Sequence, residues 1–152
     1  MLPVYYMVIC ASICIMPVLF AGAIVDYQSR RFPKNLWDIP SKIAGFFTLM
    51  MYFMLYANRE FEMIKILIAI SIVLALTFYI LALRFGSGGD YRALIYIAVL
   101  VPTMAVWTTI IAVVLGIIQV IIAHWRKTSA PWAVGIFIAF VIVFIHNIIT
   151  GF

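Results

Sequence analysis

The stretch from Ala93 to Ala123 contains no charged residue. A single helix of this length would measure about 46 Å at 1.5 Å per residue, whereas the hydrocarbon core of a bilayer is roughly 30 Å thick. Pro102-Thr103 interrupts the run, and proline is disfavoured inside a helix. We therefore expect two apolar helices here, over about 93–105 and 108–123, the first of them short.

The rest of the chain has the same character. Hydrophobic residues make up 68% of the sequence and charged residues 10%, whereas a soluble domain carries about 25% charged residues. Other apolar segments run over about 4–25, 43–57, 64–83 and 132–150. The composition predicts an all-α polytopic membrane protein with about six transmembrane helices, in a single domain over residues 1–152 and with no sizeable soluble domain.

The basic residues predict an orientation for these six spans. The polar loops on one side of the membrane would be 26–42, 84–92 and 124–131, and they hold most of the basic residues: Arg30, Arg31, Lys34, Lys42, Arg84, Arg92, Arg126 and Lys127. Only Arg59 and Lys65 fall on the other side. Because Lys and Arg concentrate in cytoplasmic loops, we expect the first side to face the cytoplasm from the plasma membrane, with both termini outside.

Three aspartates lie on the predicted cytoplasmic side. Asp26 ends the first apolar segment, where it is either an interfacial charge paired with Arg30 or Arg31, or a functional acid. Asp90 precedes an apolar segment, where it is either a helix N-cap or a functional acid. Asp38 is expected to be a solvated or interfacial charge. The acids Glu60 and Glu62 would lie on the opposite side.

Asp26 and Asp90 together favour a chemical role more strongly than either does alone. Two facing carboxylates do not ionise together easily, so the pair can share a proton. One carboxylate then activates a water that attacks a peptide carbonyl, and its protonated partner polarises that carbonyl and assists the leaving amine. Gly88 and Gly89, just before Asp90, let a substrate backbone approach closely; alternatively, they form a plain turn.

Three segments resemble a known family. SGGDYRAL, residues 87–94, resembles the Gly-x-Gly-Asp signature of intramembrane aspartic proteases, with Ser87 in place of the first glycine. It is most similar to that of the type IV prepilin and preflagellin (prearchaellin) peptidases, especially their archaeal members. DYQSRRFPKN, residues 26–35, resembles the family's other aspartate motif, in which Asp26, Arg30 and Pro33 match in register. SAPWAVG, residues 129–135, resembles the start of its last helix.

The resemblance implies a function. It assigns Asp26 and Asp90 as a catalytic dyad that needs no metal or cofactor. The substrates would be pilin-like or archaellin precursors, whose short basic leader peptides are removed at the cytoplasmic membrane face. Membrane lipids are the other expected partners. No nucleic acid is expected to bind. We expect Asp38 to attract the basic leader, Gly88 and Gly89 to bind substrate, and Arg30 and Arg92 to contact headgroups or orient the acids. The sequence has no Cys-x-x-Cys pair, so we expect peptidase activity without N-methylation.

Two other classes of protein fit the same composition. A small proton- or cation-coupled transporter would use Asp26 and Asp90 as an ion site, and its acids would lie near the bilayer midplane. An inactive assembly scaffold of a pilus or flagellar machine would not need its acids. Cys10 and Cys14 lie four residues apart in an apolar segment, where packing is a more common role than metal binding.

Overall fold

The structure, a computed structural model, describes residues 2–29, 35–85, 88–128 and 130–151. Six α-helices and a short 3₁₀ helix form the regular structure of these residues: α1 (Leu2–Ser29), η1 (Asn35–Trp37), α2 (Asp38–Ala57), α3 (Phe61–Phe85), α4 (Gly88–Leu100), α5 (Pro102–Arg126) and α6 (Trp132–Thr150). The all-α prediction is confirmed.

Five of these helices are long and apolar enough to cross a membrane: α1, α2, α3, α5 and α6. The sixth, α4, is apolar over Tyr91–Leu100 and has 13 residues, or about 20 Å. The prediction of a polytopic membrane protein is therefore confirmed. Among the described helices, α4 alone falls short of the roughly 30 Å of a hydrocarbon core.

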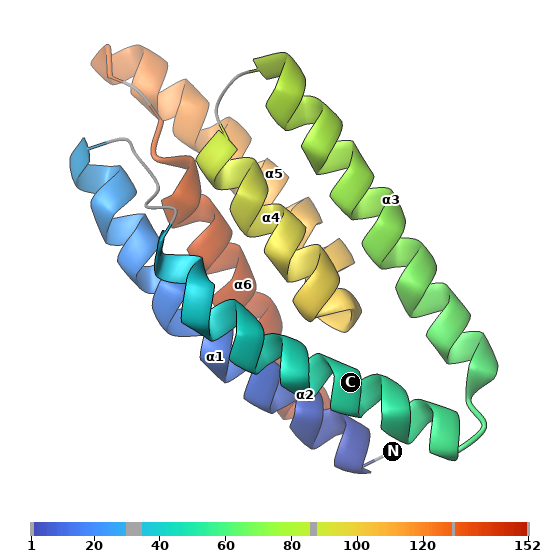
Figure 1. Ribbon diagram of the computed structural model, residues 1–152. Coiled ribbons are helices and arrows are strands. Elements are labelled where there is room, and N and C mark those ends of the chain that lie inside the picture. The colour runs from blue at the N-terminus through green and yellow to red at the C-terminus, as the bar shows by residue number, and fades with distance from the viewer. Residues whose placement is uncertain (1, 30–34, 86–87, 129, 152) are drawn as a thin grey trace.

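Successive helices run in alternating directions (Figure 1). The last turns of α1, α3 and α5 and the first turns of α4 and α6 lie at one end of the bundle, which we call the acid end because Asp26 and Asp90 belong to it. Both chain termini lie at the opposite end. There the hydroxyl of Tyr5 in α1 donates a hydrogen bond to the carbonyl of Ile148 in α6, at 3.4 Å.

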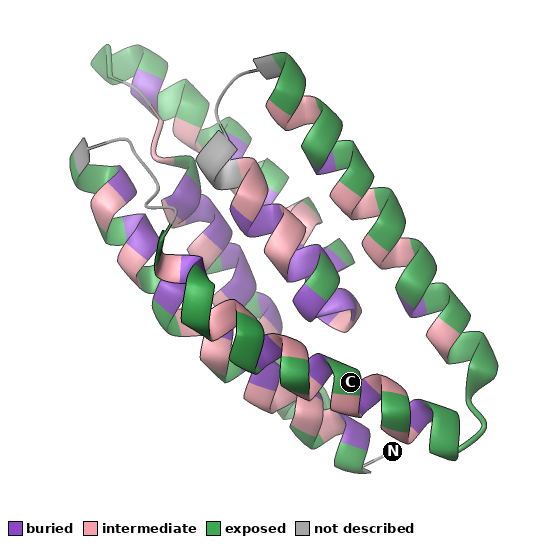
Figure 2. Cartoon of the chain, viewed as in Figure 1, coloured by how far each residue is buried: buried purple, intermediate pink, exposed green. Residues whose placement is uncertain are grey.

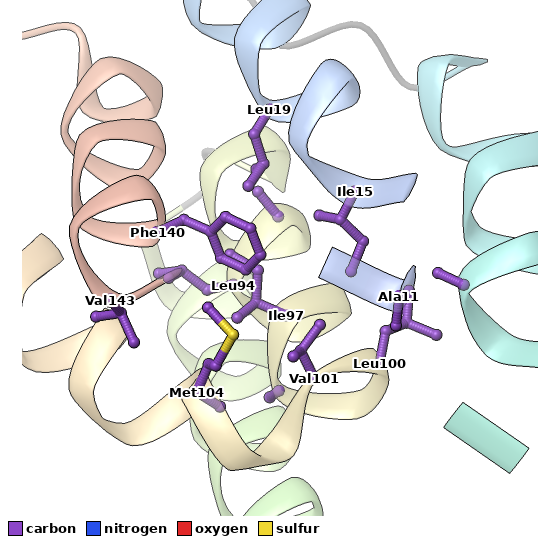
Figure 3. Close-up of a cluster of buried hydrophobic side chains, with 14 of the residues drawn as sticks. Ala11, Ile15, Leu19, Leu94, Ile97, Leu100, Val101, Met104, Phe140 and Val143 are labelled. Atoms are coloured by element: carbon purple, nitrogen blue, oxygen red, sulfur yellow. The ribbon is translucent and has the colours of Figure 1, made fainter. Parts of the chain in front are cut away.

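The short helix α4 is the centre of the bundle, since it contacts each of the five other α-helices. Its inner residues are fully buried, whereas α3 exposes most of its outer face (Figure 2). Figure 3 shows how Ile97 of α4 packs with Ile15 of α1, Met104 of α5 and Phe140 of α6. The helix that carries Asp90 thus packs against apolar side chains from three other helices.

The C-terminal end of α4 lies inside the bundle, where water cannot bind its last carbonyls. Hydroxyl groups of two neighbouring helices take that role. Thr48 in α2 donates to the carbonyl of Leu100 at 2.6 Å, and Ser71 in α3 donates to the carbonyl of Ala98 at 2.9 Å. A helix can end at membrane depth only where other groups satisfy its free backbone polar groups. These two hydrogen bonds therefore explain how α4 stays short.

The predicted break inside the long uncharged run is confirmed, but its position was wrong. The chain reverses at Val101, and Pro102 begins α5 rather than ending the helix before it. Proline suits the first position of a helix because its missing N–H would have no partner there. The helices are consequently 88–100 and 102–126, not 93–105 and 108–123.

The predicted polar loops were too long. Helix α1 continues to Ser29 and α2 begins at Asp38, so most of the expected loop 26–42 is helical. Likewise α3 continues to Phe85 and α4 begins at Gly88, so most of the expected loop 84–92 is helical. Hydropathy marks the residues that can lie in lipid, whereas backbone hydrogen bonding continues beyond them into the polar residues at each end.

Candidate functional site

Asp26 lies in the last turn of α1 and is buried, with 5% of its surface exposed. Its Oδ2 atom accepts a hydrogen bond from the backbone N–H of Ala133, at 3.2 Å. Ala133 is the second residue of α6 and is itself buried. The first aspartate is therefore fixed against the start of the last helix.

The two helix ends act on the Asp26 carboxylate with opposite signs. The C-terminal end of α1 disfavours an anion, and the N-terminal end of α6 favours one. Pro131 precedes α6 and has no side-chain acceptor for the free N–H groups of the first turn. Asp26 supplies that acceptor from another helix. This contact makes a buried carboxylate tolerable at the end of an apolar segment.

Asp90 is the third residue of α4, at the same end of the bundle as Asp26. Of the two roles that its position before an apolar segment left open, it is not the N-cap, because α4 already begins at Gly88. Gly88 and Gly89 are the first two helical residues rather than part of an open loop. The side chain of Asp90 lies outside the described part of the structure, as do Gly86 and Ser87.

The helices that carry the two aspartates contact each other and α6. Helix α1 contacts both α4 and α6, and α4 also contacts α6. All three sequence segments that resemble the peptidase motifs therefore contribute to the acid end. For two of them, the hydrogen bond between Asp26 and Ala133 is a direct contact.

The remaining candidate residues have different surroundings. Asp38 is exposed in the first turn of α2, directly after Trp37. Trp37 is fully buried and its ring stacks on that of Tyr96 in α4, with 4.5 Å between centroids. This stack fixes the start of α2 against the central helix. Arg92 is half-buried in α4, and Arg30 lies outside the described residues.

An apolar hollow of about 230 Å³ opens beside the acid end. Its lining comes from α3, α4, α5 and α6: Phe78, Leu81, Tyr91, Leu94, Ala112, Val113, Ile117, Trp132 and Ile136. Tyr91 directly follows Asp90, and Trp132 directly precedes Ala133. The hollow is therefore lined by the direct sequence neighbours of Asp90 and Ala133.

Sequence reasoning did not identify the contribution of α6. The apolar segment 132–150 was expected as a span, and SAPWAVG was matched only by resemblance. The group that α6 contributes is the backbone N–H of Ala133, which donates to Asp26. Every residue except proline carries such an N–H group, so the sequence does not mark this one. A proline just before an apolar run does mark a helix start, and a free helix start is a place for an anion.

The arrangement brings a buried carboxylate to a helix N-terminus, next to the helix that carries a second aspartate. Carboxyl groups of this kind can exchange protons with a bound reactant that lies within hydrogen-bond reach. Comparison of the chain with models of protein families, with curated proteins and with solved structures found no match.

Proposed function

We propose that this protein is a membrane-embedded aspartic endopeptidase that removes short basic leader peptides from type IV pilin-like or archaellin precursors. The observation that carries the proposal is the contact between Asp26 and Ala133, since it joins two of the three motif segments. Asp90 belongs to the third segment and lies at the same end of the bundle. The two acids form the catalytic dyad.

The surroundings of the two acids suggest different roles for them. Asp26 accepts a backbone N–H and lies at the positive end of α6, and both favour its ionised form against the opposing effects of burial and of the C-terminal end of α1. Asp26 is therefore the base that takes a proton from a water molecule. The oxygen of that water attacks the carbonyl carbon of the scissile peptide. Asp90, protonated, donates a hydrogen bond to the carbonyl oxygen and then transfers its proton to the leaving nitrogen as the C–N bond breaks.

The start of α4 provides a place for the substrate backbone. The N–H groups of a first helical turn have no partner within the helix, and Gly88 and Gly89 carry no side chain that would keep another chain away. The leader would bind there, and exposed Asp38 in α2, whose charge is opposite to that of a basic peptide, would attract it. The apolar segment after the cut would enter the hollow beside Tyr91 and Trp132.

The acid end carries the excess of basic residues, including Arg84, Arg92, Arg126 and Lys127. By the positive-inside rule, this end faces the cytoplasm. The leader of a precursor that is still anchored in the membrane would then be cut before export. Arg92 and Arg30 would contact lipid headgroups or orient the acids.

Cleavage of a pilin-like precursor in membranes tests the proposal. The wild-type chain is compared with Asp26→Asn and Asp90→Asn, each checked for normal membrane insertion. Glu62→Gln is the matched control, because Glu62 is an exposed acid at the opposite end, paired with Lys65 at 2.7 Å. We expect cleavage by the wild type and by Glu62→Gln, and none by either aspartate variant.

Other outcomes contradict the proposal. Persistent cleavage by Asp26→Asn or Asp90→Asn would remove the dyad. A second contradicting result has two parts: the wild type cuts no precursor, and it conducts protons or cations in proteoliposomes only when both aspartates are present. The protein would then be a transporter. If the aspartate variants still restore assembly in cells that lack the protein, it is a scaffold.

A further inference from the structure

Helix α5 contacts the first turn of α6 at two glycines, one in each helix. Gly116 in α5 is buried, and the ring of Trp132 in α6 fills the place that a Cβ atom at Gly116 would take. Gly135 in α6 is buried too, and a Cβ atom there would lie 2.8 Å from the side-chain oxygen of Gln119 in α5. Each helix therefore has a notch at a glycine, and a side chain of the other helix lies in it.

The spacing of these residues makes the two contacts a pair. Gly116 and Gln119 are three residues apart in α5, and Trp132 and Gly135 are three residues apart in α6. Residues three apart are neighbours on one face of a helix. One face of each helix thus provides both a notch and the side chain that occupies the notch of the other helix. Because side chains in a close-packed interior leave little free space, the double contact fixes how the start of α6 lies against α5.

The side-chain oxygen of Gln119 is an unusual group for such a contact. It is buried and accepts no hydrogen bond within the described part of the chain. A buried acceptor of this kind costs free energy that an aliphatic side chain would not cost. Gly135 is the fourth residue of α6, and the first turn of a helix attracts negative charge. The partial negative charge of the Gln119 oxygen is therefore favoured at the same helix end that binds the Asp26 carboxyl group.

Ala133 lies between the two residues of α6 that contact α5. The N–H groups of its two sequence neighbours donate to backbone carbonyls two or three residues earlier, whereas the N–H of Ala133 donates to Asp26. The direction of this N–H is set by the placement of the first turn, which cannot shift without moving Trp132 and Gly135. The contacts with α5 therefore act on the hydrogen bond between α6 and Asp26.

We propose that Gln119 is a positioning residue for Asp26. With its oxygen in the notch at Gly135, it holds the first turn of α6 where the N–H of Ala133 meets the Asp26 carboxyl group. The structural part of this inference concerns the contact between helices and stands by itself. Its consequence for catalysis rests on the proposed function, because Asp26 is a base only if the protein is a peptidase.

Hydrogen exchange of the Ala133 amide tests the structural part. The full-length protein, with isotope-labelled alanine and in detergent micelles, is transferred to heavy water and followed by NMR. Ala139 is the internal reference, because it is fully buried in the middle of α6. We expect Gln119→Ala to speed exchange at Ala133 about fivefold, as for one lost hydrogen bond, and to leave Ala139 unchanged. No acceleration, or equal acceleration at both amides, would overturn the proposal.

A second substitution tests the contact itself. A Cβ atom at Gly135 would displace the Gln119 amide, which is the end of a flexible side chain. We therefore expect Gly135→Ala to speed exchange at Ala133 by the same factor as Gln119→Ala, and the double variant to exchange no faster than either. Effects that multiply in the double variant would show two independent sites and overturn the proposal. Val120→Ala, at an exposed position of α5, should exchange as the wild type does.

Cleavage kinetics test the catalytic part. Gln119 is not among the described residues that line the apolar hollow, so Gln119→Ala should lower kcat for a pilin-like precursor and leave KM near its wild-type value. Unchanged kcat, or a change in KM alone, would overturn the positioning role. A wild type that cuts no precursor would instead remove the proposed function, and exchange at Ala133 would still decide whether Gln119 places the start of α6.

Discussion

The carboxylate of Asp26 accepts a hydrogen bond from the backbone N–H of Ala133, across 107 residues of sequence. This contact ties the last turn of α1 to the first turn of α6 and places a buried carboxyl group at a helix N-terminus. It gives Asp26 a structural role as a cap of α6 and, by our proposal, a chemical role as a base. The two roles differ in what they require of the side chain.

Asp26→Asn and Asp26→Ala should separate these roles. An asparagine oxygen still accepts the N–H of Ala133, so we expect Asp26→Asn to keep near-normal stability while cleavage is lost. Alanine accepts nothing, so Asp26→Ala should lose cleavage and also about 1 kcal/mol of stability, as for other lost helix caps. Unfolding in mixed micelles measures the stability. Equal stability of the two variants would show that the contact with Ala133 contributes nothing to the fold.

Thr48→Val should destabilise the buried end of α4. It removes the donor to the carbonyl of Leu100, and hydrogen bonds between membrane helices contribute roughly 0.6 to 1.7 kcal/mol. Thr77→Val is the matched control, because the exposed hydroxyl of Thr77 donates to the carbonyl of Val73 in its own helix and, within the described part of the chain, to no other helix. We expect that control to change stability by less than about 0.5 kcal/mol. A comparable loss in both variants would contradict the special role of Thr48.

Gly116→Ala should disturb the contact between α5 and α6. A Cβ atom at Gly116 would overlap Cζ3 of the Trp132 ring, so the ring must move. Overpacking of this kind costs about 1–3 kcal/mol. Since Trp132 precedes Ala133, we also expect slower cleavage. The unfolding free energy and the rate of precursor cleavage measure the two effects.

The control for this substitution is Gly45→Ala in α2. A Cβ atom at Gly45 would lie 3.7 Å from Cδ2 of Leu100, which is an ordinary contact. Alanine is the better helix former, so this variant should be unchanged or up to about 1 kcal/mol more stable. Destabilisation by Gly45→Ala as large as by Gly116→Ala would refute the packing argument.

Asp38→Asn should weaken substrate binding without changing the chemistry. Asp38 is exposed in the first turn of α2 and would attract the basic leader. We expect KM for a precursor to rise while kcat stays near normal, and the difference from wild type to shrink at high salt, because salt screens exposed charges. Steady-state cleavage at two salt concentrations measures both, and unchanged kinetics would exclude this role.

Labelling of single cysteines should establish the orientation. In the Cys10→Ser and Cys14→Ser background, Thr128→Cys reports on the acid end and Arg59→Cys on the opposite end; both native residues are exposed. We expect a membrane-impermeant maleimide added to intact cells to label only Arg59→Cys, and to label Thr128→Cys after permeabilisation. The reverse pattern would place the acids outside the cell and contradict cleavage at the cytoplasmic face.

The sequence determined the class of this protein because the hydrophobic effect depends on local composition. Long apolar segments between short polar ones predict membrane helices, and Pro102 predicts a break in the longest of them. The two aspartates were likewise recognisable, because charged residues at the borders of apolar segments are conspicuous. Helix ends were less predictable, since Asp38 and Gly88 begin helices in segments whose polarity suggested loops.

The tertiary structure decided where the helices end and which groups form hydrogen bonds at those ends. The carbonyl of Leu100 is satisfied by Thr48, and the carboxylate of Asp26 by the N–H of Ala133. The sequence contains each hydroxyl and acid, but backbone groups are common to almost every residue and leave no pattern by which a partner can be read. Such pairings between distant residues arise only when apolar packing brings particular helix ends together.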